Sequence, residues 1–458
     1  MMRLIEAARM VGGRAIGDAG FTGVSSDSRS VARGELFVAL RGERFDGHAF
    51  LATAASRGAA AALIDAGFFA SSATLPMPVL IVEDTRRALG DLARAWRGRF
   101  SPTLIAIAGS NGKTTAKEML VAILRASAGE ASVLATAGNL NNDIGLPLTL
   151  LGLRERHRIC AIELGMNHPG EIAYLAEIAR PGIAVVTNAQ REHLEFMHSV
   201  EEVAAENAAV YAALPVDGIA VVNADDPQAD FFRAAAGARR VVDFGLQRSA
   251  MVRGRFRPQH LASEVVIALP SGDAQVSLAI PGEHNVRNAL AAAACAHAAG
   301  IAPAAIAAGL NAFRPYRGRL QVGKTARGAT LIDDSYNANP DSVRAAIEVL
   351  AGAGGRTMLV LGDMGEVGEQ GADFHAEVGR YARDSGIEAM YAIGELTAHA
   401  VAGFGPGARH FASAETLLAA LGAWSGAGCT LLVKGSRFMQ MERVVAALAG
   451  EDRVAEAH

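Results

Sequence analysis

A short glycine-bearing stretch, IAIAGSNGKTTAKEML, carries the residue types of a phosphate-binding loop. The common nucleotide-binding pattern is G-x-x-x-x-G-K-[ST], but Ile107 stands where its first glycine would be, and the upstream glycine is Gly109. Glycines let the backbone approach a phosphate, Lys113 can neutralise the β- and γ-phosphates, and the Thr114 hydroxyl can hold Mg²⁺. The residues expected to bind ATP in this loop are Gly109, Ser110, Asn111, Gly112, Lys113, Thr114 and Thr115.

The segments on either side of the loop predict how it is held. TLIAIAG before it is a continuous apolar run, typical of a buried strand, and AKEMLVAIL after it has the pattern of a helix. A strand–loop–helix arrangement points backbone N–H groups and the helix dipole at an anion. The sequence therefore predicts binding of ATP or GTP in spite of the displaced glycine.

Length and composition indicate a globular protein of about three domains. The chain has 458 residues, of which 51% are hydrophobic and 20% are charged, and its net charge is −4. This charge argues against binding of nucleic acid, which usually requires a basic surface. The three cysteines lie far apart without metal-ligand spacing, and the N-terminus lacks the apolar core of a signal peptide. We therefore expect a cytoplasmic protein.

One long uncharged segment could suggest a membrane span. No Asp, Glu, Lys or Arg occurs from Asn288 to Phe313, and the segment is mostly alanine. However, Gly300 and Pro303 interrupt it, which favours two short buried helices. We expect no insertion into a membrane.

Apolar runs along the chain predict an α/β protein of three domains. Residues 1–98 form a small α/β domain, in which ELFVAL and PVLIVED alternate with FLATAASRGAAAALIDAG, an alanine-rich helical pattern. In residues 99–312, RICAIELG, GIAVVTNA and GIAVVNADD are typical of a parallel sheet covered by helices, and SEVVIALPSGDAQVSLAIPG predicts an antiparallel hairpin. Residues 313–458 carry the apolar strands TLIDDSY, TMLVLGD, AMYAIGE and TLLVKGS, which favour a second doubly wound, Rossmann-like domain.

Polar residues outside the loop suggest further binding functions. Asn285 and Asn288 stand at i and i+3 at the start of a predicted helix, so both amides lie on one face. This spacing suits the edge of an adenine, although helix capping explains it equally well. Only four of the 43 Lys and Arg residues are lysines. This composition favours, for Lys113 and Lys434, a role that the planar guanidinium of arginine cannot fill. A lysine, a hydroxyl and an arginine that suit a small carboxylate follow a predicted strand: Lys434, Ser436 and Arg437.

Segments in the whole chain resemble those of one enzyme family. The short loop GxxGKT[ST] is similar to that of the ATP-dependent Mur ligases and of folylpolyglutamate synthetases. The Mur ligase resemblance extends, in order, through SSDSRSVARGELFVALRGERFDGH, VLATAGNLNNDIGLPLTLL, ELGMNHPGEI, VVNADDP, PGEHNVRNALAA, RGRLQ and DDSYNANPDS. Two more segments, LGDMGEVGE and LLVKGSR, look like those of the member of this family that adds a dipeptide.

The resemblance implies an ATP-dependent ligase of peptidoglycan synthesis. Its substrates would be UDP-N-acetylmuramoyl-tripeptide and D-alanyl-D-alanine, and the family suggests a monomer. Joining a carboxylate to an amine in water needs activation, and the resemblance implies that the carboxylate attacks the γ-phosphate of ATP to form an acyl phosphate. Cations, including Mg²⁺, must then hold the two anions together.

The resemblance also implies a metal site. Glu163 ends a predicted strand at its carboxyl end, where ligands bind in open α/β sheets, and it matches the family's Mg²⁺ ligand. His193 matches the family's histidine at a second metal, and Asn188 begins the same loop. Without the resemblance, Glu163 is equally a solvated strand end and His193 an ordinary loop histidine. The expected catalytic residues are Lys113, Glu163 and His193, and the expected metal ligands are Thr114, Glu163 and His193.

Further residues are assigned to ATP and to the substrates by the same resemblance. Arg319 and Asp334 resemble groups that meet ATP when the third domain closes. Residues of the first domain resemble the segments that hold the UDP-sugar, and the C-terminal lysine, serine and arginine would hold the dipeptide carboxylate. The expected substrate-binding residues are Ser28, Arg29, Asp46, Gly47, His48, Asn139, Asn141, Asn142, Asn337, Asn339, Lys434, Ser436 and Arg437.

One position departs from the family's pattern. Most Mur ligases carry a carbamylated lysine that bridges the metals about fifteen residues after the histidine, and Asn207 stands there, with Glu206 beside it. No lysine lies between Lys117 and Lys324, so a neighbouring lysine cannot replace it. We expect Glu206 or Asn207 to supply an oxygen ligand or a hydrogen bond instead. The alternative is a second metal that is held more weakly.

Three other functions remain alternatives. The Mur ligase that adds the third residue is disfavoured because its diaminopimelate signature, DNPR, is absent. Folylpolyglutamate synthetase is disfavoured by the DSR and DGH elements of a UDP-sugar domain. A P-loop regulatory or transport ATPase would give the amide-rich segment GNLNND no evident role.

Overall fold

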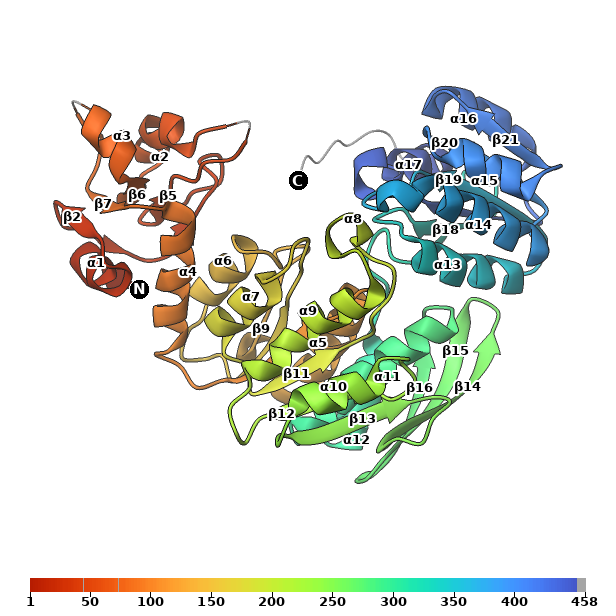
Figure 1. Ribbon diagram of the computed structural model, residues 1–458, viewed down its shortest axis with the longest axis horizontal. Helices are drawn as coiled ribbons and strands as arrows, with labels where there is room; N and C mark the ends of the chain where they lie inside the picture. The colour runs from red at the N-terminus through yellow and green to blue at the C-terminus, as the bar shows by residue number, and fades with distance from the viewer. Residues whose placement is uncertain (44, 73, 451–458) are drawn as a thin grey trace.

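The computed structural model describes residues 1–43, 45–72 and 74–450, which form three α/β domains (Figure 1). The central domain lies between the N-terminal domain, drawn in red and orange, and the C-terminal domain, drawn in blue. This arrangement confirms the predicted fold class of three α/β domains. The end of the expected C-terminal domain, residues 451–458, lies outside the described residues.

Short connections separate the three domains. Helix α4 (Thr85–Arg97) ends the N-terminal domain, and β8 (Thr103–Ala108) opens the central sheet. Helix α12 (Pro303–Ala312) ends the central domain, and β17 (Gln321–Lys324) is the first strand of the C-terminal sheet.

The central domain is built on a nine-stranded sheet in the order β16-β15-β14-β13-β12-β11-β8-β10-β9. All neighbours from β14 to β9 are parallel, as the continuous apolar runs predict. Along β8, Ile105 and Ile107 face one hydrophobic core, and Leu104 and Ala106 face another on the opposite side of the sheet. Its strands after β8 are β9 (Val133–Ala135), β10 (Ile159–Glu163), β11 (Ile183–Val186), β12 (Ile219–Asn223), β13 (Arg240–Gly245), β14 (Val252–Gln259), β15 (Ala262–Leu269) and β16 (Gly272–Leu278).

Helices cover both faces of this sheet. One core includes buried side chains of α5, α11 and α12, and the other includes side chains of α4, α6, α7, α9 and α10. The helices are α5 (Lys113–Ala128), α6 (Gly145–Leu151), α7 (Glu171–Ala179), α8 (Leu194–Met197), α9 (Val200–Ala212), α10 (Ala229–Ala236) and α11 (Glu283–Ala298). The uncharged segment thus forms α11 and α12, as predicted, and no helix in the described part of the chain is both long and apolar enough to cross a membrane.

The predicted hairpin is present as the antiparallel pair β15 and β16. The sequence analysis missed a third strand, β14, which pairs with β15 in antiparallel register. The sequence of β14, VRGRFRPQ, has three arginines and a proline among its eight residues, so its apolar pattern is weak. The packing of Val252 into the core and the pairing with β15 nevertheless hold it in the sheet.

The C-terminal domain has a six-stranded sheet in the order β17-β18-β22-β19-β20-β21. All four predicted strands are present, and β18, β22 and β19 are parallel neighbours. Their carboxyl ends therefore meet at one edge of the sheet. The elements after β17 are β18 (Thr330–Asp334), α13 (Pro340–Gly352), β19 (Arg356–Gly362), α14 (Gly371–Asp384), β20 (Ala389–Ile393), α15 (Thr397–Phe404), β21 (Ala408–Phe411), α16 (Ala414–Ala420), β22 (Cys429–Lys434) and α17 (Glu442–Ala449).

The N-terminal domain corrects one sequence prediction. The segment 50–67 is not a single helix: α2 (Leu51–Ser56) ends at a turn, and β6 (Ala61–Asp65) follows. Gly58 has a φ of +90°, which stops the helix, and the four residues from Ala61 to Ile64 are fully buried between β5 and β7. The five-stranded sheet and its helices are β2 (Arg14–Ile16), β4 (Val24–Ser25), β5 (Leu36–Val38), β6, β7 (Val79–Val82), α1 (Leu4–Val11), α2, α3 (Ala66–Ser71) and α4.

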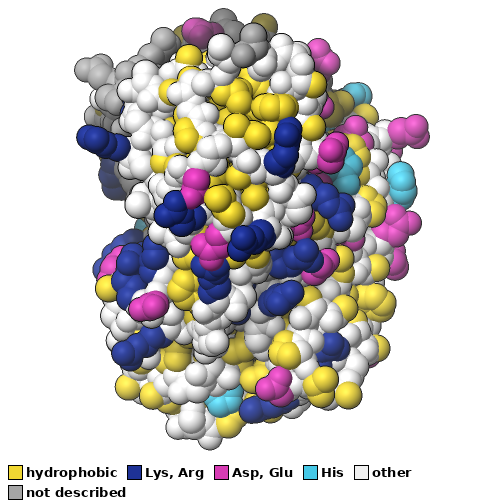
Figure 2. All heavy atoms as spheres, turned by 90° about the vertical axis from the view of Figure 1, so that its left-hand side faces the viewer, with side chains coloured by type: hydrophobic (Ala, Val, Ile, Leu, Met, Phe, Trp, Pro, Cys, Tyr) yellow, Lys and Arg dark blue, Asp and Glu magenta, His cyan; other side chains and the backbone are white. Residues whose placement is uncertain are grey.

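Figure 2 shows the face on the side of the N-terminal domain. Lys and Arg side chains, in dark blue, spread across the middle of this face with Asp and Glu side chains between them. The surface is therefore one of mixed charge, in keeping with the small net charge of the chain.

Candidate active site

The predicted phosphate-binding loop connects β8 to α5, as the sequence indicates. Gly109 and Gly112 have φ angles of +122° and +82°, in the region that favours glycine. A Cβ at Gly109 would collide with Thr187, and a Cβ at Gly112 would collide with Asn288. The displaced glycine therefore belongs to a tightly packed loop whose conformation requires it.

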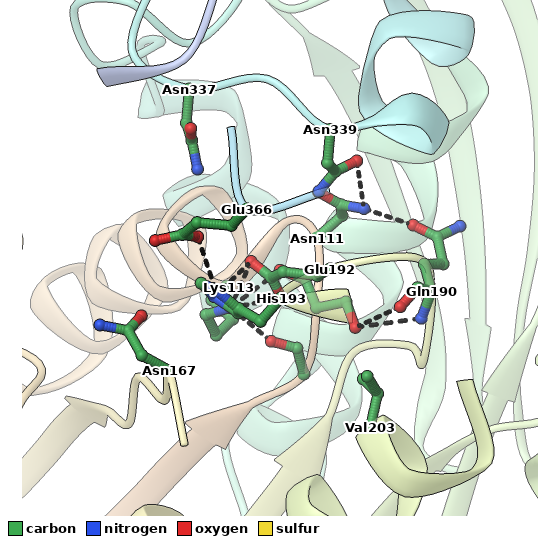
Figure 3. A network of polar contacts seen from close by, with 12 residues as sticks. Asn111, Lys113, Asn167, Gln190, Glu192, His193, Val203, Asn337, Asn339 and Glu366 are labelled. Atoms are coloured by element: carbon green, nitrogen blue, oxygen red, sulfur yellow. Dashed lines mark hydrogen bonds and ion pairs between the residues drawn. The ribbon is translucent and has the colours of Figure 1, made fainter. Parts of the chain in front are cut away.

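Lys113 is folded back onto its own loop. Its Nζ donates to the carbonyl oxygens of Gly109 (2.5 Å) and Ser110 (2.8 Å) and forms an ion pair with Glu192 at 3.3 Å. The side chain is only 12% exposed. The sequence analysis missed Glu192, although this residue directly precedes His193. The pair places an ammonium group at the mouth of the loop, where a phosphate would compete for it with Glu192 (Figure 3).

Glu163 lies at the end of β10, beside the loop. Its Oε1 accepts hydrogen bonds from the Thr114 hydroxyl (3.1 Å) and the Asn141 amide (2.8 Å), whereas its Oε2 is buried and has no partner. A buried carboxylate oxygen of this kind is unfavourable until a cation or donor binds it.

This donor set fits Mg²⁺. In proteins, Mg²⁺ usually takes one or two carboxylates together with waters and substrate phosphates, and Glu163 and Thr114 supply a carboxylate and a hydroxyl. In residues 1–43, 45–72 and 74–450, no group of three or more His, Cys, Asp and Glu side chains could hold a metal by itself. Phosphate oxygens of ATP would therefore have to complete the coordination.

His193 lies between two carboxylates. Its Nε2 is 3.6 Å from Glu192, and its Nδ1 is 2.6 Å from Glu366, at an angle outside that of a normal hydrogen bond. The contact with His193 keeps the pKa of Glu366 below its ordinary value. Glu366 belongs to the segment LGDMGEVGE of the C-terminal domain, and Figure 3 shows it extending toward His193. Glu366 itself was not among the predicted site residues, although its segment is one of those that resemble the dipeptide-adding member of the family.

Asn207 supports the loop by a hydrogen bond. Its Oδ1 accepts a hydrogen bond of 2.6 Å from the backbone N–H of Gly109, and its Nδ2 donates to the carbonyl oxygen of Val203. Glu206 turns away and accepts hydrogen bonds from backbone N–H groups at the start of α7, including that of Gly170. Of the roles expected for this pair, the structure shows hydrogen bonding: Asn207 holds the loop, and Glu206 holds the start of α7.

A cavity of about 320 Å³ opens between the loop and the C-terminal domain. Its lining includes Asn111, Gly112 and Thr115 of the loop. It also includes the four residues outside the loop that were predicted to bind ATP: Asn285, Asn288, Arg319 and Asp334. Asn288 donates its amide N–H to Asn285 Oδ1, so the two side chains lie on one face of α11, as their spacing predicts. Burial, reinforced by the charges of Lys434 and Arg287, lowers the pKa of the neighbouring His284 to about 4. Binding of adenine by this pair stays a prediction.

The predicted carboxylate site lies at the edge where the C-terminal strands end. Lys434 is buried, and its Nζ donates to Asp334 (2.6 Å) and to the carbonyl oxygen of Asn337 (2.9 Å). Burial lowers the pKa of Lys434 and raises that of Asp334, against the attraction between the two. Arg437 is 54% exposed and pairs with Glu442. The ammonium of Lys434 is already bound to Asp334 and to the carbonyl oxygen of Asn337, both in its own domain. A role for Lys434 at a substrate carboxylate therefore stays a prediction.

The residues predicted to hold a UDP-sugar are largely engaged with one another. Asp46 accepts hydrogen bonds from His48 Nδ1 (2.5 Å) and from the backbone N–H of His48 (3.0 Å), and His48 is buried. Arg29 is exposed and pairs with Asp27. In the asparagine segment, the side chain of Asn142 caps the start of α6. Ser28 is buried and Asn139 is exposed. Gly47 lies against the backbone of Ala39 and Leu40, the two residues that follow β5.

Besides the contact of His193 with Glu366, two further contacts join the central and C-terminal domains beside the loop. The side chain of Asn111 exchanges hydrogen bonds with Asn339, the N-cap of α13. Arg191 pairs with Asp341 (2.6 Å) on α13 and with Glu377 (2.8 Å) on α14. Burial alone would lower the pKa of Arg191, but these carboxylates raise it above its ordinary value. The sequence analysis missed Arg191 and both of its partners.

Comparisons with known proteins agree with this geometry. The chain matches the Mur ligase family, catalytic domain, at residues 20–97, the Mur ligase middle domain at residues 107–296, and the Mur ligase, glutamate ligase domain, at residues 318–437. It is 40% identical over 429 residues to the UDP-N-acetylmuramoyl-tripeptide–D-alanyl-D-alanine ligase of Escherichia coli (strain K12), with 93% of each chain covered. It is 34% identical over 436 residues to the ligase of the same name from Bacillus subtilis (strain 168), with 92% of each covered.

Solved structures give the same result. A crystal structure of MurF from Acinetobacter baumannii matches with a TM-score of 0.90 and 32% identity, covering 98% of this chain and 99% of that one. MurF ligase from Thermotoga maritima, solved in complex with ADP, matches with a TM-score of 0.82 and 27% identity, covering 94% and 97%. With this likeness extending through all three domains and the phosphate-binding loop in place, the chain belongs to the Mur ligase family.

Proposed function

We infer that this protein is the ATP-dependent ligase that joins D-alanyl-D-alanine to UDP-N-acetylmuramoyl-tripeptide. The product is UDP-N-acetylmuramoyl-pentapeptide, a precursor for peptidoglycan synthesis and cell wall biogenesis. The observation that carries this conclusion is the 40% identity, over 93% of both chains, to a ligase of that name. The phosphate-binding loop and the unpaired oxygen of Glu163 supply the ATP site that the reaction needs.

The reaction takes place in two steps. A carboxylate oxygen of the tripeptide attacks the γ-phosphorus of ATP, the bond to ADP breaks, and an acyl phosphate forms. The ammonium group of D-alanyl-D-alanine then loses a proton to solvent, and its free amine nitrogen attacks the acyl carbon. The nitrogen loses a second proton to solvent as inorganic phosphate leaves and the amide forms. Lys113 stabilises the charge on the phosphates during the first step, once ATP has displaced it from the carbonyl oxygens and from Glu192.

Glu163 and Thr114 would hold Mg²⁺ beside the phosphates, and His193 is the proposed ligand of a second metal. A bound Mg²⁺ neutralises phosphate charge and brings the two anions together. Asn141 orients Glu163 through its amide, and Asn207 and Asn188 hold the loop backbone. Closure of the C-terminal domain over the loop would exclude water, which would otherwise hydrolyse the acyl phosphate.

The remaining binding residues are proposed as follows. Asn285, Asn288, Arg319 and Asp334 bind the nucleoside of ATP, because they line one cavity beside the loop. Ser436 and Arg437, with Lys434 behind them, bind the carboxylate of the dipeptide. The N-terminal cluster of Ser28, Arg29, Asp46, Gly47 and His48 binds the UDP-sugar, and the asparagine segment with Asn337 and Asn339 lines the path between the two substrates.

Incubation with candidate substrates tests this function. The purified protein would receive either UDP-N-acetylmuramoyl-tripeptide or UDP-N-acetylmuramoyl-dipeptide, together with ATP and Mg²⁺. D-alanyl-D-alanine, diaminopimelate, lysine or glutamate would be added in separate reactions, and the product mass would be measured. The expected result is phosphate release and a pentapeptide product with D-alanyl-D-alanine only. A product with UDP-N-acetylmuramoyl-dipeptide and a single amino acid would indicate the ligase of the third residue, and phosphate release without either substrate would indicate a P-loop regulatory ATPase.

We also propose that the enzyme acts in the cytoplasm as a monomer. The substrates are charged nucleotides and a dipeptide, and the reaction consumes ATP. Sedimentation velocity of the purified protein checks the oligomeric state, for which the mass of a single chain is expected.

A further inference from the structure

His193 and Glu366 both adopt a left-handed backbone conformation although neither is glycine. Their φ angles are +53° and +58°, respectively. Such conformations are unfavourable for residues with a Cβ, and where they persist they often mark functional sites. The two residues come from different domains and meet, with His193 Nδ1 2.6 Å from a carboxylate oxygen of Glu366. In Figure 3 the side chain of Asn337 points toward the same carboxylate from the C-terminal domain.

Other acidic side chains at this edge of the C-terminal sheet are bound within their own domain. Asp333 and Asp363 accept hydrogen bonds from backbone N–H groups of that domain, and Asp334 pairs with buried Lys434. Glu366 differs from them, because it is 45% exposed and its ion pair is with a residue of the central domain. Its carboxylate is therefore accessible at the side of the domain that faces the phosphate-binding loop.

Ser436 links the loop of Glu366 to that of Arg437. The Ser436 hydroxyl accepts a hydrogen bond of 2.7 Å from the backbone N–H of Gly365 and donates one of 3.0 Å to the carbonyl oxygen of Ala338. Gly365 directly precedes Glu366, and Ser436 directly precedes Arg437, so this hydrogen bond holds the two loops together next to both charged residues. An anionic and a cationic side chain stand on neighbouring loops, which matches a ligand that carries both charges.

We propose that Glu366 binds the ammonium group of the incoming dipeptide and holds its nitrogen toward the reacting carbonyl. The proposal rests on the function inferred above, for which a dipeptide must be bound as a zwitterion: its α-amino group is largely protonated at neutral pH, and its carboxylate is charged. Arg437 is the partner of the carboxylate, and Glu366 is the partner of the ammonium. Without substrate, His193 occupies the position that the ammonium takes.

The variant Glu366→Gln tests this assignment, because it keeps the shape and removes the charge. We expect the KM for D-alanyl-D-alanine to rise about 10- to 100-fold, with the KM values for ATP and for the UDP-linked tripeptide within about twofold of wild type. Glu369→Gln, an exposed glutamate three residues further along, is the matched control and should leave all three KM values unchanged. The fold of each variant would be checked by its thermal melting temperature.

A second measurement uses a ligand without the amine. Propionyl-D-alanine has the shape of the dipeptide but no ammonium group, and its inhibition constant would be compared with the KM of D-alanyl-D-alanine. Wild-type protein should prefer the dipeptide, and Glu366→Gln should lose that preference. A lower kcat in Glu366→Gln with an unchanged KM for the dipeptide would overturn the proposal. That result would assign Glu366 to the orientation of His193. If wild-type protein makes no pentapeptide, the proposed function fails instead.

Discussion

The side-chain amides of Asn111 and Asn339 exchange hydrogen bonds across the boundary between the central and C-terminal domains. Asn339 Nδ2 donates to Asn111 Oδ1 at 2.8 Å, and Asn111 Nδ2 donates to Asn339 Oδ1 at 3.3 Å. Asn111 belongs to the phosphate-binding loop, and Asn339 caps α13, with its Oδ1 accepting from the N–H of Ser342. A movement of the C-terminal domain would therefore break or strain these hydrogen bonds to the loop that is proposed to bind ATP.

The variant Asn339→Ser separates this contact from helix capping. Serine caps a helix about as well as asparagine, but it is too short to reach Asn111. We expect the KM for ATP to rise about three- to tenfold while the melting temperature stays within about 2 °C of wild type. Asn339→Ala should weaken ATP binding similarly and also destabilise the fold by about 1 kcal/mol, because it removes the cap. Unchanged ATP kinetics in both variants would show that the amide pair does not couple the domains.

Arg191 provides a second test of domain closure. Its guanidinium bridges Asp341 and Glu377, two carboxylates of the C-terminal domain. A lysine cannot span both in this way, so Arg191→Lys should weaken the contact. We expect a larger radius of gyration by small-angle X-ray scattering and a lower kcat. Arg344→Lys is the control, because Arg344 pairs with the same Glu377 from within the C-terminal domain and should leave the radius of gyration unchanged.

The sequence predicted the framework well because buried parallel strands have continuous apolar runs. The sequence identified the strand before the loop, the helical segment after it and four of the six strands of the C-terminal sheet. The strands β9, β13, β17 and β21 were not predicted, and two further differences, at β14 and β6, have clear physical causes. Strand β14 has alternating arginines that hide its apolar face. The alanines of β6 favour a helix by themselves, but burial and pairing with β5 and β7 make this segment a strand.

Contacts between side chains that lie far apart in the sequence could not be predicted in the same way. Glu192 and Glu366 stand beside identified residues in the sequence, but their importance arises from what they meet in space: Lys113 in one case and His193 in the other. Arg191 gives no signal at all, since its partners lie about 150 and 186 positions away. The sequence points to Asn207 or Glu206 as the source of a metal ligand or a hydrogen bond. Only the structure shows that the Asn207 amide oxygen accepts a hydrogen bond from the loop backbone.

Asn207 is expected to act on ATP binding and not on metal binding. Its Oδ1 holds the N–H of Gly109, and its own Nδ2 is bound to Val203. Asn207→Ala should therefore raise the KM for ATP about tenfold, since one buried hydrogen bond to the loop is lost. The Mg²⁺ concentration for half-maximal rate at saturating ATP should not change. A marked increase in that concentration would contradict this role and favour Asn207 as a metal ligand.

Glu163 should show the opposite pattern. In Glu163→Gln the oxygen that meets Thr114 and Asn141 is kept, and the unpaired Oε2 is replaced by an uncharged amide nitrogen. We expect the Mg²⁺ concentration for half-maximal rate to rise at least tenfold, because a carboxylate is a far better ligand for Mg²⁺ than an amide N–H. Binding of Mn²⁺ in the presence of ADP, followed by electron paramagnetic resonance, should weaken in parallel. Unaltered Mn²⁺ binding would exclude Glu163 as a ligand.

His284 makes stability depend on pH. Burial, with the charges of Lys434 and Arg287, lowers its pKa from 6.5 to about 4, so the unfolded chain takes up the proton before the folded one does. The contribution of neutral His284 to stability is therefore complete above about pH 6.5 and declines as the pH falls toward 4, by up to about 3 kcal/mol.

Thermal melts of wild type and His284→Gln between pH 7.5 and about 4.5 measure this effect, because glutamine does not titrate. The melting temperature of wild type should fall relative to that of the variant as the solution becomes more acidic. A difference between the two proteins that stays constant across this range would mean that His284 is as easily protonated in the folded protein as in the unfolded chain. Its place beside Lys434 and Arg287 makes that outcome unfavourable, since an imidazolium there would meet two positive charges.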